Sequence, residues 1–505
     1  MLAAKKPIKI GHGKMWLICV TISGALYLAV LTYLTWTLSD QHHFGSQIYD
    51  AYYAALLDGR FDLSARVLRF EGHYAPDGRG YLYHGLAPLL TRFILGWAWP
   101  FEVLPMIGVS IWFWSVVGIA AWQSVVVTLS RSAGVWQTRR RLVLCLCGAL
   151  WIAGPGPLLV INLSLYHEPI AVSFACTGLF AAVWTRACHG QMGLGFAVAL
   201  LAVCAAVVLH ARPNVAVGLY LGTVLAVLWG IKSARVAFVL PAFIALSLLG
   251  VGALGYVGVN AARFGDITTV HGSFSGGYII YGNVYWGIEA ADSERAAAFE
   301  EHGRFNILRV IPNGIMYLFR LPTGHLSGAL ESMFRSVTEP VLGYIRIAPI
   351  RWGLFALWPM WCLLAFSGIK SVRYDPKMTG LVVALAVSAG LTLAYGTISF
   401  RYQFDLWPII AVLACLGAIA VLRATKSEDQ ATPSIHYYAL ALMVGLVVTD
   451  IALTEYKNFG REVPGHYFQT WSKDFCLQRA SAPSLGLSDA QSQWTCRPPP
   501  YFGDS

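Results

Sequence analysis

An acidic side chain that follows a long apolar run is the first candidate for chemistry in this sequence. Asp50 lies in the segment 47–63, where helical spacing gathers aromatic side chains, Tyr53 among them, around it. A carboxylate that is partly shielded from water can have a raised pKa and act as a base. Asp40 lies nearer the end of the apolar run and could take the same role. The alternative is that Asp50 only caps an interfacial helix, because Asp is a favoured N-cap residue.

Arginine side chains in short turns are the second candidate, because a guanidinium group presents a rigid fork of donors that matches phosphate oxygens. Arg212 and Arg401 lie in such turns, and Glu168 and Asp405 lie in or next to them. Several arginines at one rim would hold a lipid-linked phosphate. The alternative is that each arginine pairs with one of these carboxylates or with a lipid head group. Ionisable residues at membrane depth are costly and are therefore functional candidates.

Tyrosine and histidine side chains gather in the segment 71–88. Tyr81 and His84 are expected close to the bilayer, where they suit either a sugar or an interfacial aromatic belt. A metal site would need ligands from the nearby histidines, which are His42, His43, His73 and His84. Their spacing resembles no zinc motif, so a divalent metal is allowed but unsupported.

The composition indicates what must position these side chains. Of the 505 residues, 57% are hydrophobic and only 12% are charged, and the mean hydropathy is +0.58. Soluble globular domains carry about 25% charged residues, whereas disordered chains have low hydrophobicity and high net charge. Both classes are therefore excluded. We expect an all-α polytopic membrane protein.

Eleven apolar runs are long enough to cross a hydrocarbon core of about 30 Å. They lie near 15–38, 104–129, 142–163, 169–187, 193–210, 213–231, 237–259, 350–369, 378–396, 405–422 and 436–454. The stretch 86–101 is apolar but shorter and is interrupted by Arg92. It is typical of a re-entrant or interfacial segment.

The charges between these runs predict their orientation. Alternate loops, beginning with residues 1–14, are short and basic, and their acidic residues are only Asp375, Glu428 and Asp429. An excess of Lys and Arg in short loops marks the cytoplasmic side. The N-terminus is therefore expected in the cytoplasm and the C-terminus outside, in a multi-pass membrane protein. The net charge of +10 reports this orientation and not a nucleic-acid partner.

Three long hydrophilic segments would then face outward, and they are 39–103, 260–349 and 455–505. The expected organisation is a cytoplasmic N-terminus (1–14), a membrane module (15–454) that includes the first two segments, and an outer tail (455–505). In the tail, Cys476 and Cys496 could form a disulfide if the compartment is oxidising.

The second hydrophilic segment opens with Arg263 and contains a stretch rich in Gly, Tyr and Ser at 273–287, which could cover a binding cleft. The stretch 291–305 is expected to be a solvated helix without chemistry. Motifs of soluble enzymes are missing from the sequence, including the phosphate-binding loop of ATPases, the dinucleotide fingerprint, the GxSxG elbow and HExxH. ATP-driven transport by this chain is therefore not expected.

The layout resembles the GT-C superfamily of integral-membrane glycosyltransferases. The segment YDAYYAALLDGRFDL (49–63) is similar to the Asp-Glu-x-x-Tyr helix of the aminoarabinose and protein-mannosyl transferase branches. Asp50 matches the catalytic Asp and Tyr53 matches the Tyr, whereas Ala51 stands in place of the second acid. Shorter patches that resemble uncharacterised bacterial members are YLYHGLAPLL (81–90), YHEPIA (166–171), ARP (211–213), NAARFG (260–265) and RYQFDLWP (401–408).

The resemblance implies a protein of a bacterial inner membrane that transfers a sugar from a polyprenyl-phosphate donor to a glycan, lipid or protein acceptor outside that membrane. Asp50, or Asp40, would take the proton of the acceptor hydroxyl, and attack opposite the phosphate would invert the sugar. Arg401 and Arg212 would neutralise the departing phosphate. The secondary candidates for the phosphate are Arg263 and His167, and those for the substrate are Tyr53, Tyr81, His84 and Glu168. No nucleotide site is implied.

Three alternatives stay open. A lipid-linked glycan flippase or another transporter would also have many spans and arginines near lipid phosphate, although transporters often carry midplane polar residues. An O-antigen polymerase or ligase would also act outside on lipid-linked glycans, and the segment 260–349 could be its functional loop. The absence of the second acid at Ala51 is also compatible with an inactive scaffold.

Overall fold

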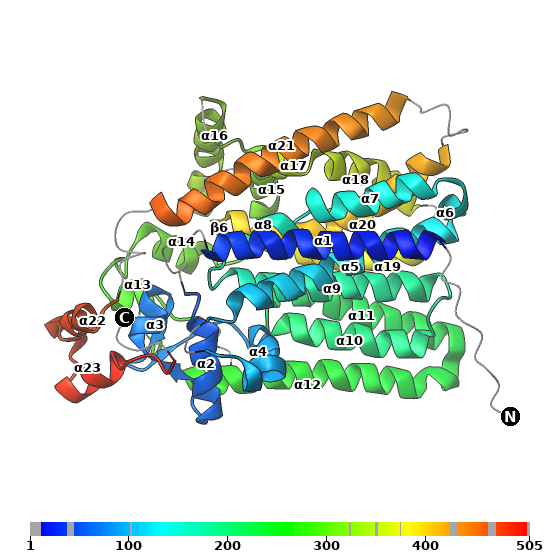
Figure 1. Cartoon of the computed structure of the whole chain (residues 1–505). Coiled ribbons are helices and arrows are strands. Elements are labelled where there is room, and N and C mark those ends of the chain that lie inside the picture. Colours follow the sequence, from blue (N-terminus) through cyan, green and yellow to red (C-terminus); the bar gives the residue numbers. More distant parts are fainter. Residues whose placement is uncertain are drawn as a thin grey trace.

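The computed structural model describes residues 12–37, 45–101, 104–267, 269, 271–275, 277–322, 325–348, 352–373, 375–424, 433–462 and 471–501. Within these ranges the chain is a bundle of long apolar helices with hydrophilic segments gathered at one end (Figure 1). The protein is therefore an all-α polytopic membrane protein. Asp40, His42 and His43 lie outside the described residues.

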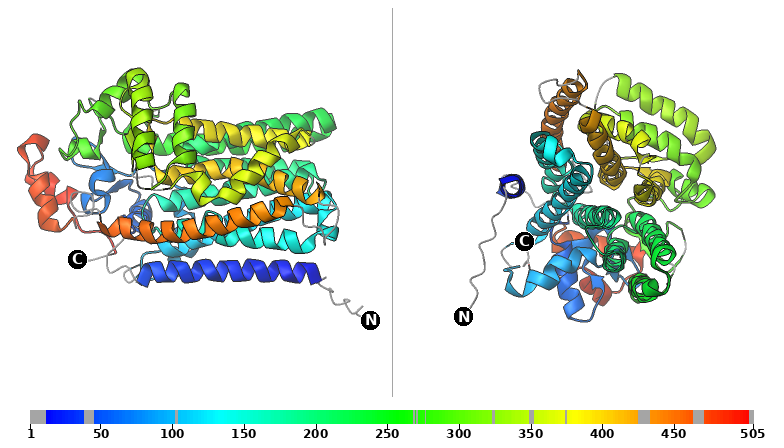
Figure 2. Two further views of the ribbon diagram at one scale, coloured as in Figure 1. Left: turned by 90° about the horizontal axis from the view of Figure 1, so that it is seen from above. Right: turned by 90° about the vertical axis from the view of Figure 1, so that its right-hand side faces the viewer.

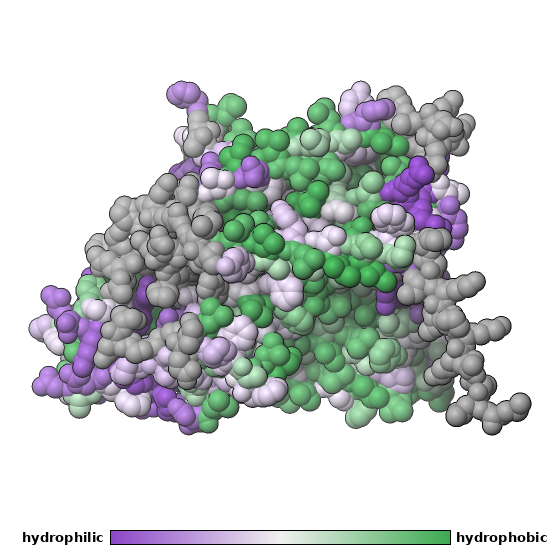
Figure 3. Space-filling model, viewed as in Figure 1, coloured by the Kyte–Doolittle hydropathy of each residue, from purple (hydrophilic) through white to green (hydrophobic). Residues whose placement is uncertain are grey.

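Eight helical segments of the described chain are long and apolar enough to cross a membrane. They are Gly13–Thr35, Ile107–Ser132, Arg140–Val160, His167–Cys188, Pro213–Phe264, Pro376–Ala394, Phe400–Ala424 and Ile435–Glu455. The apolar side chains of the bundle form a broad surface belt, with hydrophilic side chains at its two ends (Figure 3). Exposed apolar side chains of this kind suit contact with lipid.

The helices of the bundle cover all eleven apolar runs. Their bounds are α1 His12–Thr37, α5 Ile107–Ser132, α7 Arg140–Ile152, α8 Gly156–Val160, α9 His167–Cys188, α10 Leu194–Leu209, α11 Pro213–Ala234, α12 Val239–Phe264, α17 Leu354–Leu357, α18 Pro359–Val372, α19 Pro376–Ala394, α20 Gln403–Ala424 and α21 Pro433–Glu462, with the short α6 Val135–Thr138 between α5 and α7. Helices α10 and α18 have 16 and 14 residues and are short for a span.

Small residues bring neighbouring helices of the bundle close together. A Cβ atom on Gly368 of α18 would lie 1.9 Å from the carbonyl oxygen of Leu413, and one on Gly417 of α20 would lie 1.9 Å from that of Leu364. Small residues at such contacts let helix backbones approach in a membrane, where the hydrophobic effect does not drive association. Helix α1 instead lies at the rim of the bundle (Figure 2).

The loop end, as we call the end where the hydrophilic segments gather, contains mostly short elements, and its longest helix has 18 residues. From the first segment they are α2 Ile48–Leu57, β1 Asp62–Leu63, α3 Ala65–Leu68, η1 Arg69–Glu71, β2 His73–Tyr74, β3 Gly80–Tyr81, η2 Ala87–Leu89, α4 Leu90–Leu95 and η3 Gly96–Ala98. From the second segment they are β4 Ile280–Tyr281, α13 Gly282–Tyr285, α14 Glu294–His302, η5 Ile307–Arg309, α15 Val310–Phe319, α16 His325–Leu342 and β5 Arg346–Ile347. Before α20 lie β6 Thr397–Ile398 and η6 Phe400–Tyr402, and the tail contains α22 Lys473–Ala480, η7 Pro483–Leu485 and α23 Asp489–Thr495.

Two small sheets join segments that are far apart in the sequence. The first has the strand order β1-β3-β2-β4, so β2 of the first segment pairs with β4 of the second, with His73 opposite Tyr281. The second pairs β5 with β6 in parallel, with Arg346 opposite Thr397. These pairings bring both hydrophilic segments to the start of α20.

Candidate functional site

A cavity of about 390 Å³ lies at the loop end, between the hydrophilic segments and the ends of the bundle helices. Its volume is within the range of about 300–1,000 Å³ that is usual for ligand pockets. Its lining contains five arginines, which are Arg212, Arg295, Arg304, Arg346 and Arg401. Among the described residues that line it, Glu71 carries the single carboxylate. The cavity therefore has the charge of an anion-binding site.

Arg401 lies on the side of the cavity formed by the bundle. It lies in η6, between β6 and α20, and its guanidinium carbon lies 3.8 Å from the ring centre of Tyr166, which precedes α9. A cation stacked on an aromatic ring is held by the ring quadrupole and keeps its charge. Arg401 forms no ion pair with any carboxylate in the described part of the chain. Its charge is therefore available to a ligand.

Arg212 lies beside Arg401 but is neutralised. Pro213 fits the first turn of α11 because its ring fixes φ, and Arg212 immediately precedes that helix. Its Nη2 atom donates to Oδ2 of Asp405 on α20, and its guanidinium lies 5.0 Å from the ring centre of Tyr402. Here the alternative raised from the sequence, that Arg212 pairs with Asp405, is what the structure contains. Arg212 still lines the cavity.

The second segment supplies the remaining arginines. Arg295 of α14 packs against the rings of Phe274 and Tyr281, at 4.8 and 5.1 Å from their centres, and lies 3.5 Å from Glu289. Arg304 donates from Nη2 to the carbonyl oxygen of Gly272 at 3.1 Å. Arg304 forms no ion pair with a carboxylate of the described ranges.

The stretch 291–305, for which a solvated helix without chemistry is expected, contributes to the cavity wall. The stretch does contain the polar helix α14, but two of its arginines line the cavity. The β2–β4 pairing folds the second segment over the first, and this packing turns one face of α14 inward. The hydrophilicity of the stretch thus serves a polar cavity and not only solvent.

Glu71 ends η1 and reaches the cavity from the first segment. Its charge interacts with three tyrosines of the lining, which are Tyr83, Tyr166 and Tyr281. Burial raises the pKa of each phenol, and the nearby carboxylate of Glu71 raises each pKa further. The three hydroxyl groups therefore stay protonated at neutral pH and can donate hydrogen bonds. No ion pair to Glu71 is formed within the described ranges.

The two histidines of the cavity are neutral. Burial, followed by the charge of Arg304, lowers the pKa of His271 to about 3. Burial, followed by the charges of Arg212 and Arg401, lowers the pKa of His84 well below its usual value. A positive cavity disfavours a further positive charge. These rings can therefore exchange hydrogen bonds with a ligand but add no charge at neutral pH.

Asp50 does not line this cavity. Its Oδ1 atom accepts a hydrogen bond from Nε of Arg92 at 2.7 Å, and its Oδ2 atom accepts one from the backbone N–H of Met106 at 3.2 Å. Nη1 of the same Arg92 donates to Oε1 of Glu168. The side chains of all three are 0% exposed. We call this group the sealed triad.

The sealed triad contains two residues that are expected in the site from the sequence, Asp50 and Glu168. Burial raises the pKa of Asp50, as expected for a shielded base, while the charge of Arg92 opposes the shift. Both oxygens of Asp50 are nevertheless occupied by protein donors, so an acceptor hydroxyl cannot reach them without displacing Arg92. Glu168, expected to bind substrate, is held by the same guanidinium. Glu168 therefore holds the first segment against α9 through Arg92, and Asp50 holds α2 against α4 within that segment.

The remaining predicted residues also lie outside the cavity lining. Arg263 donates to the carbonyl oxygens of Leu82 and His84 and to the side chain of Asn260, and so supports the segment that presents His84. His167 is in hydrogen-bond contact with Ser164 through Nδ1 at 3.1 Å. Tyr53 packs on Phe93 and Phe101, and Tyr81 lies in β3 opposite Asp62 and His73. Of the predicted site residues, the cavity brings together Arg212, Arg401 and His84.

Comparison of the chain with protein-family models, with curated proteins and with solved structures finds no match. A fold alone does not identify an activity, so we infer the function from the residues of the site.

Proposed function

We propose that this protein is a membrane glycosyltransferase that moves a sugar from a polyprenyl-phosphate donor to an acceptor hydroxyl. The observation that carries the proposal is the charge of the cavity, which has five arginines and one carboxylate in its described lining. Buried charge is costly unless it is paired. Arg304 and Arg401 lack a carboxylate partner in the described chain, so an anionic ligand would supply one.

The location of the cavity favours a lipid-linked anion over a soluble one. The cavity lies at the end of the bundle, and η6, which leads into α20, and the start of α11 both contribute to its wall. A polyprenyl chain could remain among lipids while its phosphate reaches Arg401. A guanidinium group fits phosphate oxygens and stabilises the charge that develops on a leaving phosphate.

Glu71, and not Asp50, is the carboxylate we assign to the reaction. The acceptor oxygen attacks the anomeric carbon as the bond from that carbon to the phosphate oxygen breaks, and the lipid phosphate leaves with the electron pair. Glu71 takes the proton of the acceptor hydroxyl. Attack opposite the leaving group inverts the sugar. The neighbouring tyrosine hydroxyls would orient the sugar by donating hydrogen bonds.

The sidedness follows from the charges of the loops. We propose eleven spans, with α10 and α18 among them, an N-terminus in the cytoplasm of a bacterial cell and the loop end outside. The short basic loops then lie inside, in agreement with the positive-inside rule. The acceptor would be a glycan, lipid or protein of the cell envelope. The residues assigned here require no metal.

The test is sugar transfer by the purified protein in lipid vesicles. The donors are a panel of polyprenyl-phosphate hexoses and pentoses with labelled sugar, and the acceptors come from an envelope extract. We expect label to leave one donor of the panel, and Arg401→Gln to weaken use of that donor with little effect on the acceptor KM. The matched control is Arg423→Gln at the opposite end of α20.

Two results would overturn the proposal. One is that no donor loses its sugar while the intact donor moves between the leaflets of the vesicle, which would identify a transporter. The other is an unchanged donor KM in Arg401→Gln.

A further inference from the structure

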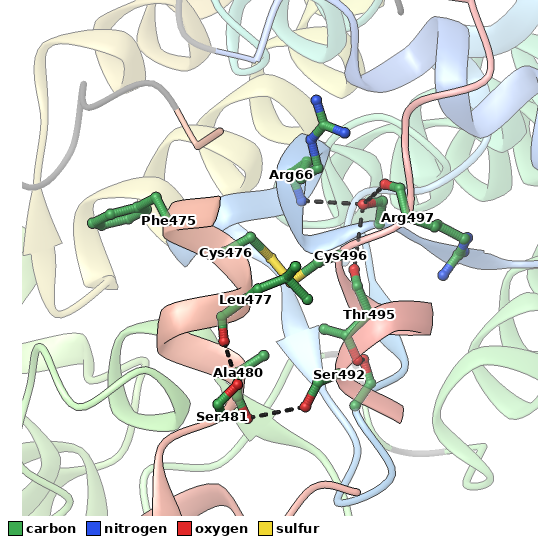
Figure 4. Close-up of a disulfide and its surroundings, with 12 residues drawn as sticks. Arg66, Phe475, Cys476, Leu477, Ala480, Ser481, Ser492, Thr495, Cys496 and Arg497 are labelled. Atoms are coloured by element: carbon green, nitrogen blue, oxygen red, sulfur yellow. Dashed lines mark hydrogen bonds between the residues drawn. A yellow bond between two sulfur atoms is a disulfide. The ribbon is translucent and has the colours of Figure 1, made fainter. Parts of the chain in front are cut away.

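The tail, which we define as residues 471–501, folds back over the first hydrophilic segment. Its helices α22 and α23 are joined by a disulfide between Cys476 and Cys496, the pair expected from the sequence (Figure 4). The hydroxyl of Ser492 also donates to the carbonyl oxygen of Ala480 at 3.3 Å. Each helix of this closed unit contacts the segment that carries Glu71.

The α23 side holds the segment on both flanks of Glu71. Upstream of Glu71, Ser64 donates from its hydroxyl to the carbonyl oxygen of Arg497 at 2.6 Å. Downstream, the hydroxyl of Thr495 donates to the carbonyl oxygen of Gly78 at 3.1 Å. Arg497 also pairs with Asp62 at 2.6 Å.

The α22 side contacts the residue next to Glu71. The ring centre of Trp471 lies 5.0 Å from that of Phe70 and 5.0 Å from that of Trp286, in edge-to-face contact with both rings. Arg479 donates to the carbonyl oxygen of Trp286 at 3.1 Å. Trp471 therefore links Phe70 of the first segment to Trp286 of the second.

The backbone beside Phe70 is strained. Arg69 has φ 52° and ψ −136°, a conformation that residues with a side chain rarely adopt. The hydroxyl of Tyr74 donates to the carbonyl oxygen of Arg69 at 2.6 Å. Strain of this kind persists only where the surrounding structure fixes it, and it is found at functional sites. The conformation that presents Glu71 therefore depends on its packing partners.

We infer that the disulfide-closed tail positions Glu71, with Trp471 as the positioning residue that fixes Phe70 beside it. This rests on the proposed function. The disulfide keeps α22 and α23 together, so that Trp471 holds Phe70 while Thr495 and Arg497 hold the flanks. Without it, the strained turn at Arg69 relaxes and the Glu71 carboxylate leaves its place among the tyrosines. The arginines of the bundle side, which bind the phosphate, do not depend on the tail.

The first test removes the disulfide with Cys476→Ala and Cys496→Ala together. We expect kcat for sugar transfer to fall at least about tenfold, since misplacing a catalytic group by about 1 Å can cost about 100-fold. The donor KM should stay within about twofold of wild type, because uniform binding by Arg401 is retained. The matched control is Cys145→Ala, which removes a free cysteine from α7 and should change neither parameter.

The second test leaves the disulfide intact and removes the indole ring of Trp471. Trp471→Ala should lower kcat in the same way, and Trp471→Phe should retain most of the wild-type kcat. The control is Trp97→Ala, at an exposed tryptophan of η3, which should leave kcat unchanged. Hydrogen exchange of the amides of residues 64–78 should speed up in Trp471→Ala and in the double cysteine variant. This readout does not require activity.

The outcomes separate the inference from the function on which it rests. If the wild type transfers sugar but both tail variants keep its kcat, the positioning role is wrong and the proposed function stands. Unchanged exchange over residues 64–78 would reject the positioning role as well. If the wild type transfers no sugar, the proposed function fails, and the exchange measurement still decides whether the tail orders this segment.

Discussion

The sealed triad and the cavity are built from the same side chains but in opposite proportions. The triad places one arginine, Arg92, between two carboxylates, and solvent reaches none of the three. The cavity places five arginines around the single carboxylate of Glu71 in its described lining. In the triad every charged group has a charged partner, whereas Arg304 and Arg401 have no carboxylate partner in the described chain.

This difference indicates which acid, Asp50 or Glu71, is available for chemistry. A carboxylate whose oxygens are filled by protein donors stabilises the fold, because separating it from its arginine would leave a buried charge unpaired. The Glu71 carboxylate instead lines a cavity with Arg304 and Arg401, which have no carboxylate partner in the described chain, so Glu71 is accessible to a ligand. The raised pKa of Asp50 would favour it as a base, but accessibility and charge balance favour Glu71.

The largest expected effect is that of Glu71→Gln. The amide cannot take a proton, so kcat should fall about 10²- to 10⁴-fold, the usual contribution of a general base. Initial rates of sugar transfer in vesicles measure it. Glu300→Gln, at an exposed position of α14, is the matched control and should retain the wild-type rate. A Glu71→Gln protein with the wild-type rate would remove Glu71 from the mechanism.

The next effect is on stability and belongs to the triad. Arg92→Met leaves Asp50 and Glu168 buried without their cation, so it should cost about 3–5 kcal/mol of unfolding free energy, as for other broken buried ion pairs. Thermal unfolding in detergent measures the loss. A melting temperature equal to that of the wild type would show that the triad does not hold the first segment to α9.

Asp50→Asn separates the two regions most cleanly. Arg92 keeps Glu168 as its partner, and the loss of one charged hydrogen bond should cost only about 1–3 kcal/mol of stability. The rate per folded molecule should stay within about threefold of wild type, a bound that is small beside the general-base contribution of about 10² or more. Abolished transfer by a well-folded Asp50→Asn protein would return the catalytic role to Asp50.

A further expected effect is a pH dependence of stability that comes from the cavity. The pKa of His271 is lowered to about 3, whereas an unfolded histidine titrates near its ordinary value of about 6.5. Between these values the unfolded state binds a proton that the folded state does not, so stability falls as the pH falls through this window. The slope for one proton is about 1.4 kcal/mol per pH unit. His271→Asn should remove one such step from melting curves at pH 4–7, and unchanged curves would contradict it.

Much of the architecture is readable from the sequence, because an apolar run of 18 or more residues has few alternatives to a helix. Arg212, Arg401 and His84 could be predicted for the same reason, since turns between spans meet at one membrane surface. Run length alone does not fix where a helix begins, because the described part of the run 350–369 is divided between two helices, α17 and the 14-residue α18.

The carboxylate of the cavity could not be chosen from the sequence. Asp50 and Glu71 both follow the first apolar run, and only pairing in space distinguishes them. In the sequence, Arg92 only interrupts an apolar stretch, and the structure shows its two carboxylate partners. Arg295 and Arg304 lie in a polar stretch, and the β2–β4 pairing that turns them inward joins strands about 200 residues apart. The one available signal was the position of Glu71 at the start of the segment that contains Tyr83 and His84.

The most direct test of the central claim is a structure of the full chain with a polyprenyl-phosphonate sugar, whose bond to the sugar the protein cannot cleave. We predict density for the phosphonate against Arg401 and for the sugar beside Glu71, with the sealed triad unchanged. Phosphonate density against Arg92, or a cavity without density at saturating ligand, would contradict it.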